Sequence, residues 1–215
     1  MTWMRMPGQT WLEVAASFLT MWVLMMMAMM LPSLVLTLSR YREAVRPSDE
    51  GLLGWLTLST GLGYFSFWTL LGLPAFAVGV ALAKIEMQQP ALSRAVPVAV
   101  GVVVLTAGVL QLTSWKAHQL ACCRKKLPCI PALRPSPARA WRHGLQIGLQ
   151  CFRCCGNLMV ISLVVGVMDL RAMALVAAAI TAERLAPVGE RVACAIGVVV
   201  AGAGLCLIAR AMGLA

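Results

Sequence analysis

The sequence predicts an all-α, polytopic transmembrane helical bundle, and two observations support this fold class. Of the 215 residues, 60% are hydrophobic and only 12% are charged, whereas soluble domains have about 45–50% apolar and about 25% charged residues. The apolar residues also form long unbroken runs. Runs of about 18 or more apolar residues cross a hydrocarbon core of about 30 Å as a single helix. We therefore expect one integral membrane domain over residues 1–215, in contact with the lipid bilayer.

Apolar runs define the expected five spans, at 14–38, 52–82, 95–115, from Gly144 onward, and 192–210. The first run ends without a small-residue cleavage site, so we expect it to stay in place as a span. The second is long enough to tilt or to break near Pro74. The fourth extends to about residue 185, and a break near Asp169 would raise the count from five spans to six.

Basic residues concentrate in one proline-rich connecting segment, at about 116–143. Seven of the 18 Lys and Arg residues lie between Lys116 and Arg142, in a chain with a net charge of +10. The positive-inside rule places such a segment in the cytoplasm, so we expect a multi-pass membrane protein with this loop inside. Its prolines make regular helix unfavourable. No aromatic-interleaved basic module accompanies the charge, which argues against nucleic-acid binding.

Small residues follow one face of the last span. Gly197, Ala201 and Gly204 recur at helical spacing, and small residues let two membrane helices approach closely. We expect such faces to pack helices inside the bundle, or to contact a protein partner or a second copy of the chain.

The densest group of metal-ligand residues is the segment 151–159, CFRCCGNLM. On a helix that turns 100° per residue, Cys151, Cys154 and Cys155 fall within an arc of about 100°. Three thiols on one face can bind a single soft metal ion or exchange a disulfide, but cysteine is also a common small hydrophobe in buried helices. No second CxxC pair follows at the distance of a zinc ribbon. A cytoplasmic location would keep these thiols reduced, which favours a metal over a disulfide.

Methionines dominate the segment 21–30, MWVLMMMAMM, in the first span. Met25 and Met29 step by four residues, as do Met26 and Met30, so they share one broad helical face. Thioethers select Cu(I) over harder ions, whereas methionine also fills irregular gaps in a core. Met30 and Cys155 would lie about 12 and 16 Å from the inner ends of their spans, at about 1.5 Å per residue. The two groups could therefore meet in one layer of the bundle.

A second set of candidate ligands lies in the basic segment: His118, Cys122, Cys123, Cys129 and His143. Soft and borderline ligands close together suit a point of metal uptake, although the positive charge of the segment opposes cation capture.

Carboxylates in the fourth apolar run are further candidates. Asp169 and Glu183 could each bind a cation or pair with an arginine, because charges at membrane depth are functional candidates. The alternative is a position at the membrane interface, with the charged group reaching water.

Several distinct motifs follow one another through residues 20–185: Trp22 with MMMAMMLPS, Gly63-Tyr64 with Trp68, CxxCCxxLM from Cys151 to Met159, then GVM and ER. In order and spacing they resemble a bacterial family of predicted metal-binding integral membrane proteins, a domain of unknown function. The resemblance implies a helical, multi-pass protein of the bacterial inner membrane whose central cysteines bind a metal.

The chain departs from that family's pattern around the cysteines. The pattern has glycine and tryptophan where this chain has Arg153 and Gly156. In the preceding loop Lys116 matches, while Gln119 replaces the first of two cysteines and Cys123 matches the second; an asparagine of the pattern is Asp169 here. An arginine beside the thiols would repel a cation unless it is paired.

These patterns together predict a membrane protein that binds a soft transition metal, with copper as Cu(I) favoured, and that handles or delivers it rather than catalysing a reaction. The expected ligands are Cys151, Cys154, Cys155, Met25, Met26, Met29 and Met30. A metal-free membrane scaffold or assembly subunit is the alternative. A membrane redox enzyme or oxygenase subunit would need more histidines and carboxylates, and only the broken spans would support a transporter.

Overall fold

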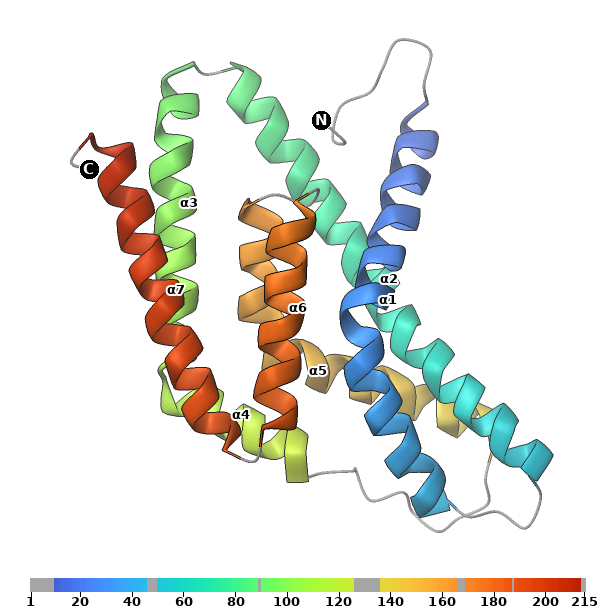
Figure 1. The fold of residues 1–215 in the computed structure, drawn as a ribbon. Coiled ribbons are helices and arrows are strands. Elements are labelled where there is room, and N and C mark those ends of the chain that lie inside the picture. Colours follow the sequence, from blue (N-terminus) through green and yellow to red (C-terminus); the bar gives the residue numbers. More distant parts are fainter. Residues whose placement is uncertain are drawn as a thin grey trace. The chain divides into compact units, whose positions relative to one another are not determined.

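The computed structural model describes residues 10–45, 50–88, 90–125, 136–165, 169–186 and 188–213. Throughout these residues the regular structure is helical, with no strand (Figure 1). The helices are α1 (Trp11–Val45), α2 (Glu50–Gln88), α3 (Pro90–Gln111), α4 (Ser114–Lys125), α5 (Pro137–Val165), α6 (Leu170–Leu185) and α7 (Gly189–Ala211). The all-α prediction is confirmed.

Among the described helices, four are long and apolar enough to cross a membrane, namely α1, α2, α5 and α7. A fifth span results if α3 and α4 are counted as one broken helix, bent by 67°. This number agrees with the expected five. The fourth apolar run does break near Asp169, since α6 begins at Leu170 as a separate helix of 16 residues. This helix is too short to be counted as a span, so the break does not raise the number to six.

Prolines interrupt the chain less than expected. α2 continues through Pro74 as a single helix of 39 residues, so the second run does not break there. The expectation that 116–143 avoids regular helix is wrong for the described part, since α4 extends to Lys125 and α5 begins at Pro137. Proline suits the first turn of a helix, where its missing N–H would have no intrahelical acceptor. The other three prolines of the segment lie outside the described residues.

Asp169 forms the N-cap of α6. Its Oδ1 accepts hydrogen bonds from the backbone N–H of Arg171 at 2.9 Å and of Ala172 at 3.4 Å. These are two of the N–H groups that lack an acceptor within the first turn of a helix. The side chain of Asp169 is exposed, so this candidate ligand serves as the start signal of α6.

Replacing Asp169 by alanine should destabilise the protein by about 1 kcal/mol, because two N–H groups lose their acceptor. Asp169→Asn is the matched control, since asparagine caps a helix as well as aspartate does. The measurement is thermal unfolding of the detergent-solubilised protein, followed by circular dichroism. Equal losses in both variants would contradict the capping role and assign the effect to the charge.

The described residues form two compact units. The first contains α1, α2 and α5 up to Leu149. Here α1 packs along α2, and the indole Nε1 of Trp22 donates to the backbone carbonyl of Trp68 over 2.9 Å. Tyr64 and Trp68, which the sequence places on one helical face, are both 1% exposed. Large aromatic side chains therefore form the core between these two helices.

The second unit contains α4, α6, α7, nearly all of α3, and α5 from Gln150 onward. Figure 1 shows α3 alongside α7, and glycines make this approach possible. A Cβ added at Gly108 of α3 would lie 2.5 Å from the backbone nitrogen of Ala201, and one at Gly204 would lie 2.5 Å from that of Leu105. Gly197 also contacts α3. The small-residue face expected on the last span thus packs helices within this unit.

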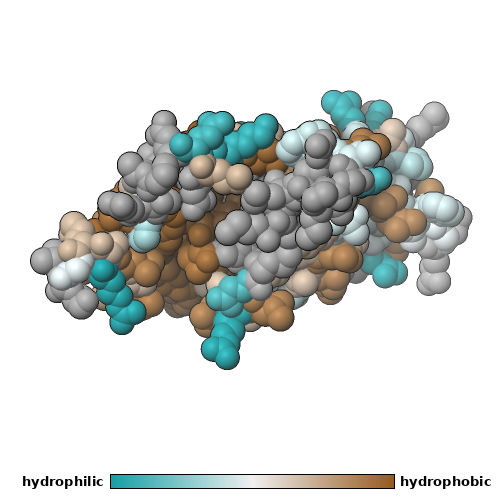
Figure 2. Space-filling model, turned by 90° about the horizontal axis from the view of Figure 1, so that it is seen from above, coloured by the Kyte–Doolittle hydropathy of each residue, from teal (hydrophilic) through white to brown (hydrophobic). Residues whose placement is uncertain are grey.

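Large apolar side chains remain exposed along the outer faces of the helices. Leu170, Leu175 and Val199 have exposed fractions of 77%, 72% and 71%. In the space-filling view, apolar residues reach the surface between scattered polar ones (Figure 2). Apolar surface of this extent is typical of faces that contact lipid or another protein.

Candidate functional site

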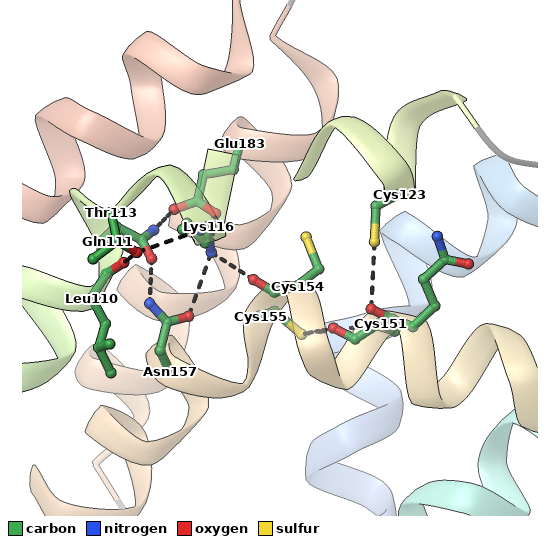
Figure 3. Close-up of polar contacts among 11 residues, drawn as sticks. Leu110, Gln111, Thr113, Lys116, Cys123, Cys151, Cys154, Cys155, Asn157 and Glu183 are labelled. Atoms are coloured by element: carbon green, nitrogen blue, oxygen red, sulfur yellow. Dashed lines mark hydrogen bonds and ion pairs between the residues drawn. The ribbon is translucent and has the colours of Figure 1, made fainter. Parts of the chain in front are cut away.

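The three predicted cysteine ligands are buried on α5, in the second unit. Cys151 is 2% exposed, and Cys154 and Cys155 are 1% exposed. Cys151 and Cys155 lie one turn apart with their Sγ atoms at 3.7 Å, and the Cys155 thiol also donates to the Cys151 carbonyl over 3.0 Å. Cys154 instead packs with Cys123 of α4, so the triplet divides into a pair and a neighbour (Figure 3).

The separation of the Cys151 and Cys155 sulfur atoms suits binding to one metal ion. With the metal–thiolate bond length of about 2.3 Å known for zinc, two sulfurs at this separation subtend about 107° at a shared ion. That angle is close to the one between ligands of a tetrahedral or trigonal site. Small rotations of the two side chains would move the sulfur atoms apart and widen the sulfur–metal–sulfur angle. An ion with fewer ligands has such a wider angle.

Arg153, which stands where the resembling family has glycine, is exposed. It lies two residues from both Cys151 and Cys155, so at 100° per residue its side chain leaves the opposite side of the helix. The guanidinium group therefore does not lie among the buried thiols. The repulsion expected from the sequence is reduced by this separation, because the Coulomb energy falls with distance.

Met159 adds a further sulfur atom to the face of the cysteine pair. It lies one turn beyond Cys155 and is 5% exposed. Cys151, Cys155 and Met159 therefore recur every four residues, and each step turns by only about 40° around the helix. Sequence reasoning did not single out Met159 as a ligand, although this spacing was the signal that could have found it.

A closed ring of buried polar side chains lies beside the cysteines (Figure 3). Lys116 Nζ forms an ion pair with Glu183 Oε2 at 2.9 Å and donates to Asn157 Oδ1 at 3.4 Å. Gln111 Nε2 donates to Glu183 Oε1, and Asn157 Nδ2 donates to Gln111 Oε1, which closes the ring. Lys116 Nζ also donates to the backbone carbonyl of Cys154 over 2.5 Å. One residue each of α3, α4, α5 and α6 contributes to this polar ring.

The polar ring places Glu183 at the junction of the broken span. Both of its carboxylate oxygens are engaged, one by Lys116 and one by Gln111. Gln111 ends α3 and Lys116 lies in the first turn of α4, so the carboxylate bridges the two helices across their bend. Glu183 is 1% exposed, so its carboxylate does not reach water as the alternative considered for it would require. Its charge is compensated within the unit by the ammonium group of Lys116.

Sequence reasoning missed two members of the polar ring. Gln111 and Asn157 are separated by 46 residues, and Gln111 and Glu183 by 72. An amide in an apolar helix indicates that a partner is needed, but it does not indicate which residue is the partner. Lys116 was noted only as a match to the family pattern.

The remaining candidate ligands are distributed over both units. His118 and Cys122 lie one turn apart on α4, with Nε2 and Sγ separated by 3.6 Å. Cys123 faces the interior, where its Sγ donates to the Gln150 carbonyl over 3.4 Å. His143 lies on the part of α5 that belongs to the first unit. Cys129 is outside the described residues.

The four predicted thioether ligands are buried on α1, in the first unit. Met25, Met26, Met29 and Met30 are 6%, 2%, 3% and 0% exposed, while Met27 between them is 36% exposed. These values agree with one inward-facing methionine face. A site shared between this face and the cysteines would join residues of different units, and it stays a prediction.

Within the described ranges, no three side chains among histidine, cysteine, aspartate and glutamate gather closely enough to hold a metal ion. A metal ion at the cysteine pair on α5 would therefore need a further ligand of another kind, or it would have to be an ion that accepts two ligands. Soft thiolate and thioether donors both favour Cu(I).

Comparison with known families adds to this picture. A family model described as a copper chaperone, PpoB2, matches residues 19–207. No curated protein and no solved structure matches the chain. The matched region begins within α1 and ends within α7, so it includes the methionine face, the polar ring and the cysteines. The match agrees with the metal-related family that the motifs resemble. This chain belongs to the copper chaperone family.

Proposed function

We propose that the protein binds Cu(I) as its cargo within the second unit and passes it to a partner protein. The observation that carries the proposal is the buried pair of thiols, Cys151 and Cys155, whose Sγ atoms lie 3.7 Å apart. This pair occurs in a chain whose family is described as a copper chaperone. Thiolates select Cu(I) over harder ions, so the donor atoms fit the cargo.

The proposed ligand set is the pair of thiolates, and a neutral thioether lies one turn beyond Cys155 on the same helix. Met159 follows on the same face of α5 and is buried. A thioether carries no charge, so Met159 offers a neighbouring soft donor without the desolvation cost of another buried anion. Cys154 lies next to the pair and provides a thiolate to which the ion can move.

The length and composition of the helices support a role in the membrane. Four described helices, or five with the bent pair, are long and apolar enough to span a bilayer. We place the protein in the bacterial inner membrane, with the basic segment in the cytoplasm as the positive-inside rule predicts. The exposed apolar faces then contact lipid or the protein that receives the copper.

The methionine face of α1 is proposed as a second group of copper ligands. Met25, Met26, Met29 and Met30 are all buried, and four thioethers on one face can hold Cu(I) weakly and without net ligand charge. Such weak ligands suit an ion that has to leave the protein again. This assignment is separate from the thiol pair and is tested by replacing the four methionines with leucine.

In the protein purified under reducing conditions with copper, the cysteine pair should hold about one copper ion, and Cys151→Ser with Cys155→Ser should lower the copper content by that ion, because hydroxyl groups are hard ligands. Elemental analysis of the detergent-purified protein measures the stoichiometry. The double variant Cys194→Ser with Cys206→Ser is the matched control, since both of these cysteines are exposed on α7. It should keep the copper.

Arg153→Ala provides a second control in the same experiment. Because Arg153 is exposed on the opposite side of α5, this variant should also keep its copper. A reduced wild-type protein without copper, or a Cys151/Cys155 double variant with the wild-type content, would overturn the proposal. Either result would favour the metal-free scaffold.

A further inference from the structure

We propose that His118 and Cys122 form a surface site for Cu(I), from which the ion reaches the buried pair through Cys123 and Cys154. The inference rests on the proposed function, because it assigns the route by which the same cargo enters. All of these residues lie in the second unit. The route has three structural steps, from the surface to the core of that unit.

The surface site lies on α4. His118 is exposed and Cys122 is half-buried, and their Nε2 and Sγ atoms are 3.6 Å apart. Residues four apart on a helix face the same side, so both donor atoms can turn toward one ion. Imidazole and thiolate are both ligands of Cu(I), and two ligands are enough to capture the ion from a dissolved complex.

The second step leads from Cys122 to its neighbour Cys123, whose side chain faces another side of α4. Cys123 follows Cys122 in the chain but faces the interior, where it packs against the cluster of Leu120, Cys154 and Ala193. Cys154 in this cluster is 1% exposed. Adjacent cysteines on α4 thus place one sulfur toward solvent and the next against a buried cysteine of α5.

The third step lies within α5. Cys154 is the chain neighbour of Cys155, and Cys155 lies 3.7 Å from Cys151 between Sγ atoms. Sulfur ligands therefore follow one another from the surface of α4 to the buried pair. The exposed Cys194 and Cys206 lie on α7, outside this series, and they serve as reference thiols below.

Transfer along this series requires only ligand exchange. At each step the incoming thiol loses its proton and forms a bond to copper, while the outgoing thiolate loses its bond and takes up a proton. Copper stays Cu(I), so the transfer needs neither an oxidant nor a reductant. Lys116 of α4 donates a hydrogen bond to the backbone carbonyl of Cys154 on α5. This bond keeps the two helices together during the exchange.

The experiment measures how fast the buried pair takes up copper. Anaerobic full-length protein in detergent is mixed with Cu(I)–glutathione, and uptake is followed by stopped-flow absorption in the thiolate-to-copper charge-transfer region. His118→Ala with Cys122→Ser should slow uptake by about tenfold or more, because the surface ligands raise the copper concentration near the route. The equilibrium affinity of the buried pair, measured by competition with a Cu(I) chelator, should not change.

Two further variants separate the route from the destination. Cys123→Ser should leave copper on the surface site and slow its passage to the buried pair. In the Cys151/Cys155 double serine variant, any remaining copper should be bound at the surface site. Adding His118→Ala and Cys122→Ser to this variant should therefore remove it. Cys194→Ser with Cys206→Ser is the matched control for loss of two thiols and should load at the wild-type rate.

The outcomes distinguish the two hypotheses. If His118→Ala with Cys122→Ser loads at the wild-type rate while the Cys151/Cys155 variant has lost its copper, the route is refuted and the proposed function stands. If the Cys151/Cys155 variant keeps the wild-type copper content, the proposed function itself fails. A lowered equilibrium affinity with an unchanged uptake rate would also contradict the route, because it would make His118 and Cys122 part of the final site.

Discussion

Lys116→Met is expected to destabilise the protein by about 3–5 kcal/mol, which is the range measured when one partner of a buried ion pair is removed. Methionine keeps the length of the lysine chain but leaves the carboxylate of Glu183 without a counterion, at 1% exposure. The Asn157 amide and the Cys154 carbonyl lose a donor at the same time. Chemical unfolding of the detergent-solubilised protein, followed by circular dichroism, measures the change in free energy of unfolding.

The double variant Lys116→Met with Glu183→Gln provides the control. It removes both charges together, so it should cost clearly less than the sum of the two single variants, by a coupling energy within about 0.5–3 kcal/mol. The amide oxygen introduced by Glu183→Gln would still accept a hydrogen bond from Gln111. Strictly additive single and double variants would contradict the pairing, and a loss below about 1 kcal/mol for Lys116→Met would match an exposed ion pair instead.

Gly204→Ala is expected to destabilise the second unit by about 1–3 kcal/mol, as overpacking does. The new Cβ would lie 2.5 Å from the backbone nitrogen of Leu105 and 2.7 Å from its Cα. Backbone atoms of a helix cannot move aside separately, so α3 and α7 would have to separate. Alanine otherwise favours a helix over glycine by about 1 kcal/mol, so a loss of stability can only come from the contact.

Gly202→Ala is the matched control on the same helix. A Cβ at this position meets nothing within 4 Å, so only the preference of alanine for helix remains, and stability should stay equal or rise by up to about 1 kcal/mol. Thermal unfolding of both variants in the same detergent measures the difference. If the two glycines respond alike, close packing between α3 and α7 is refuted.

Local patterns were enough to predict most of the helical architecture. Apolar runs located α1, α2, α3 and α7, because the length needed to cross a hydrocarbon core is a property of a single segment. A break near Asp169 was considered as an alternative, because a charged residue lies in a run that is too long for one span. The helical state of residues 116–125 was not expected, because the prolines of the segment were taken to affect all of it. α4 ends at Lys125, before the first of them.

The candidate site was predicted in part. Helical spacing placed Cys151 and Cys155 on one face, and the sulfur separation agrees with it. The orientation of Arg153 away from these thiols follows from the same spacing, yet the sequence reading weighed only its proximity in the chain. Gln111 and Asn157 had no local signal, since their role depends on partners that the fold brings together.

Composition and periodicity predicted a helical, membrane-type protein with candidate sulfur ligands in two places, and the described residues are helical. These properties belong to single helices. The hydrophobic length is a property of one segment, and the residues on one face of a helix recur with the helical period. Only the tertiary structure shows that Lys116 neutralises Glu183 across the bend between α3 and α4, and that Cys123 meets Cys154. Such contacts join helices that are distant in the chain. They depend on how closely backbones approach and which polar groups must be satisfied once water is excluded.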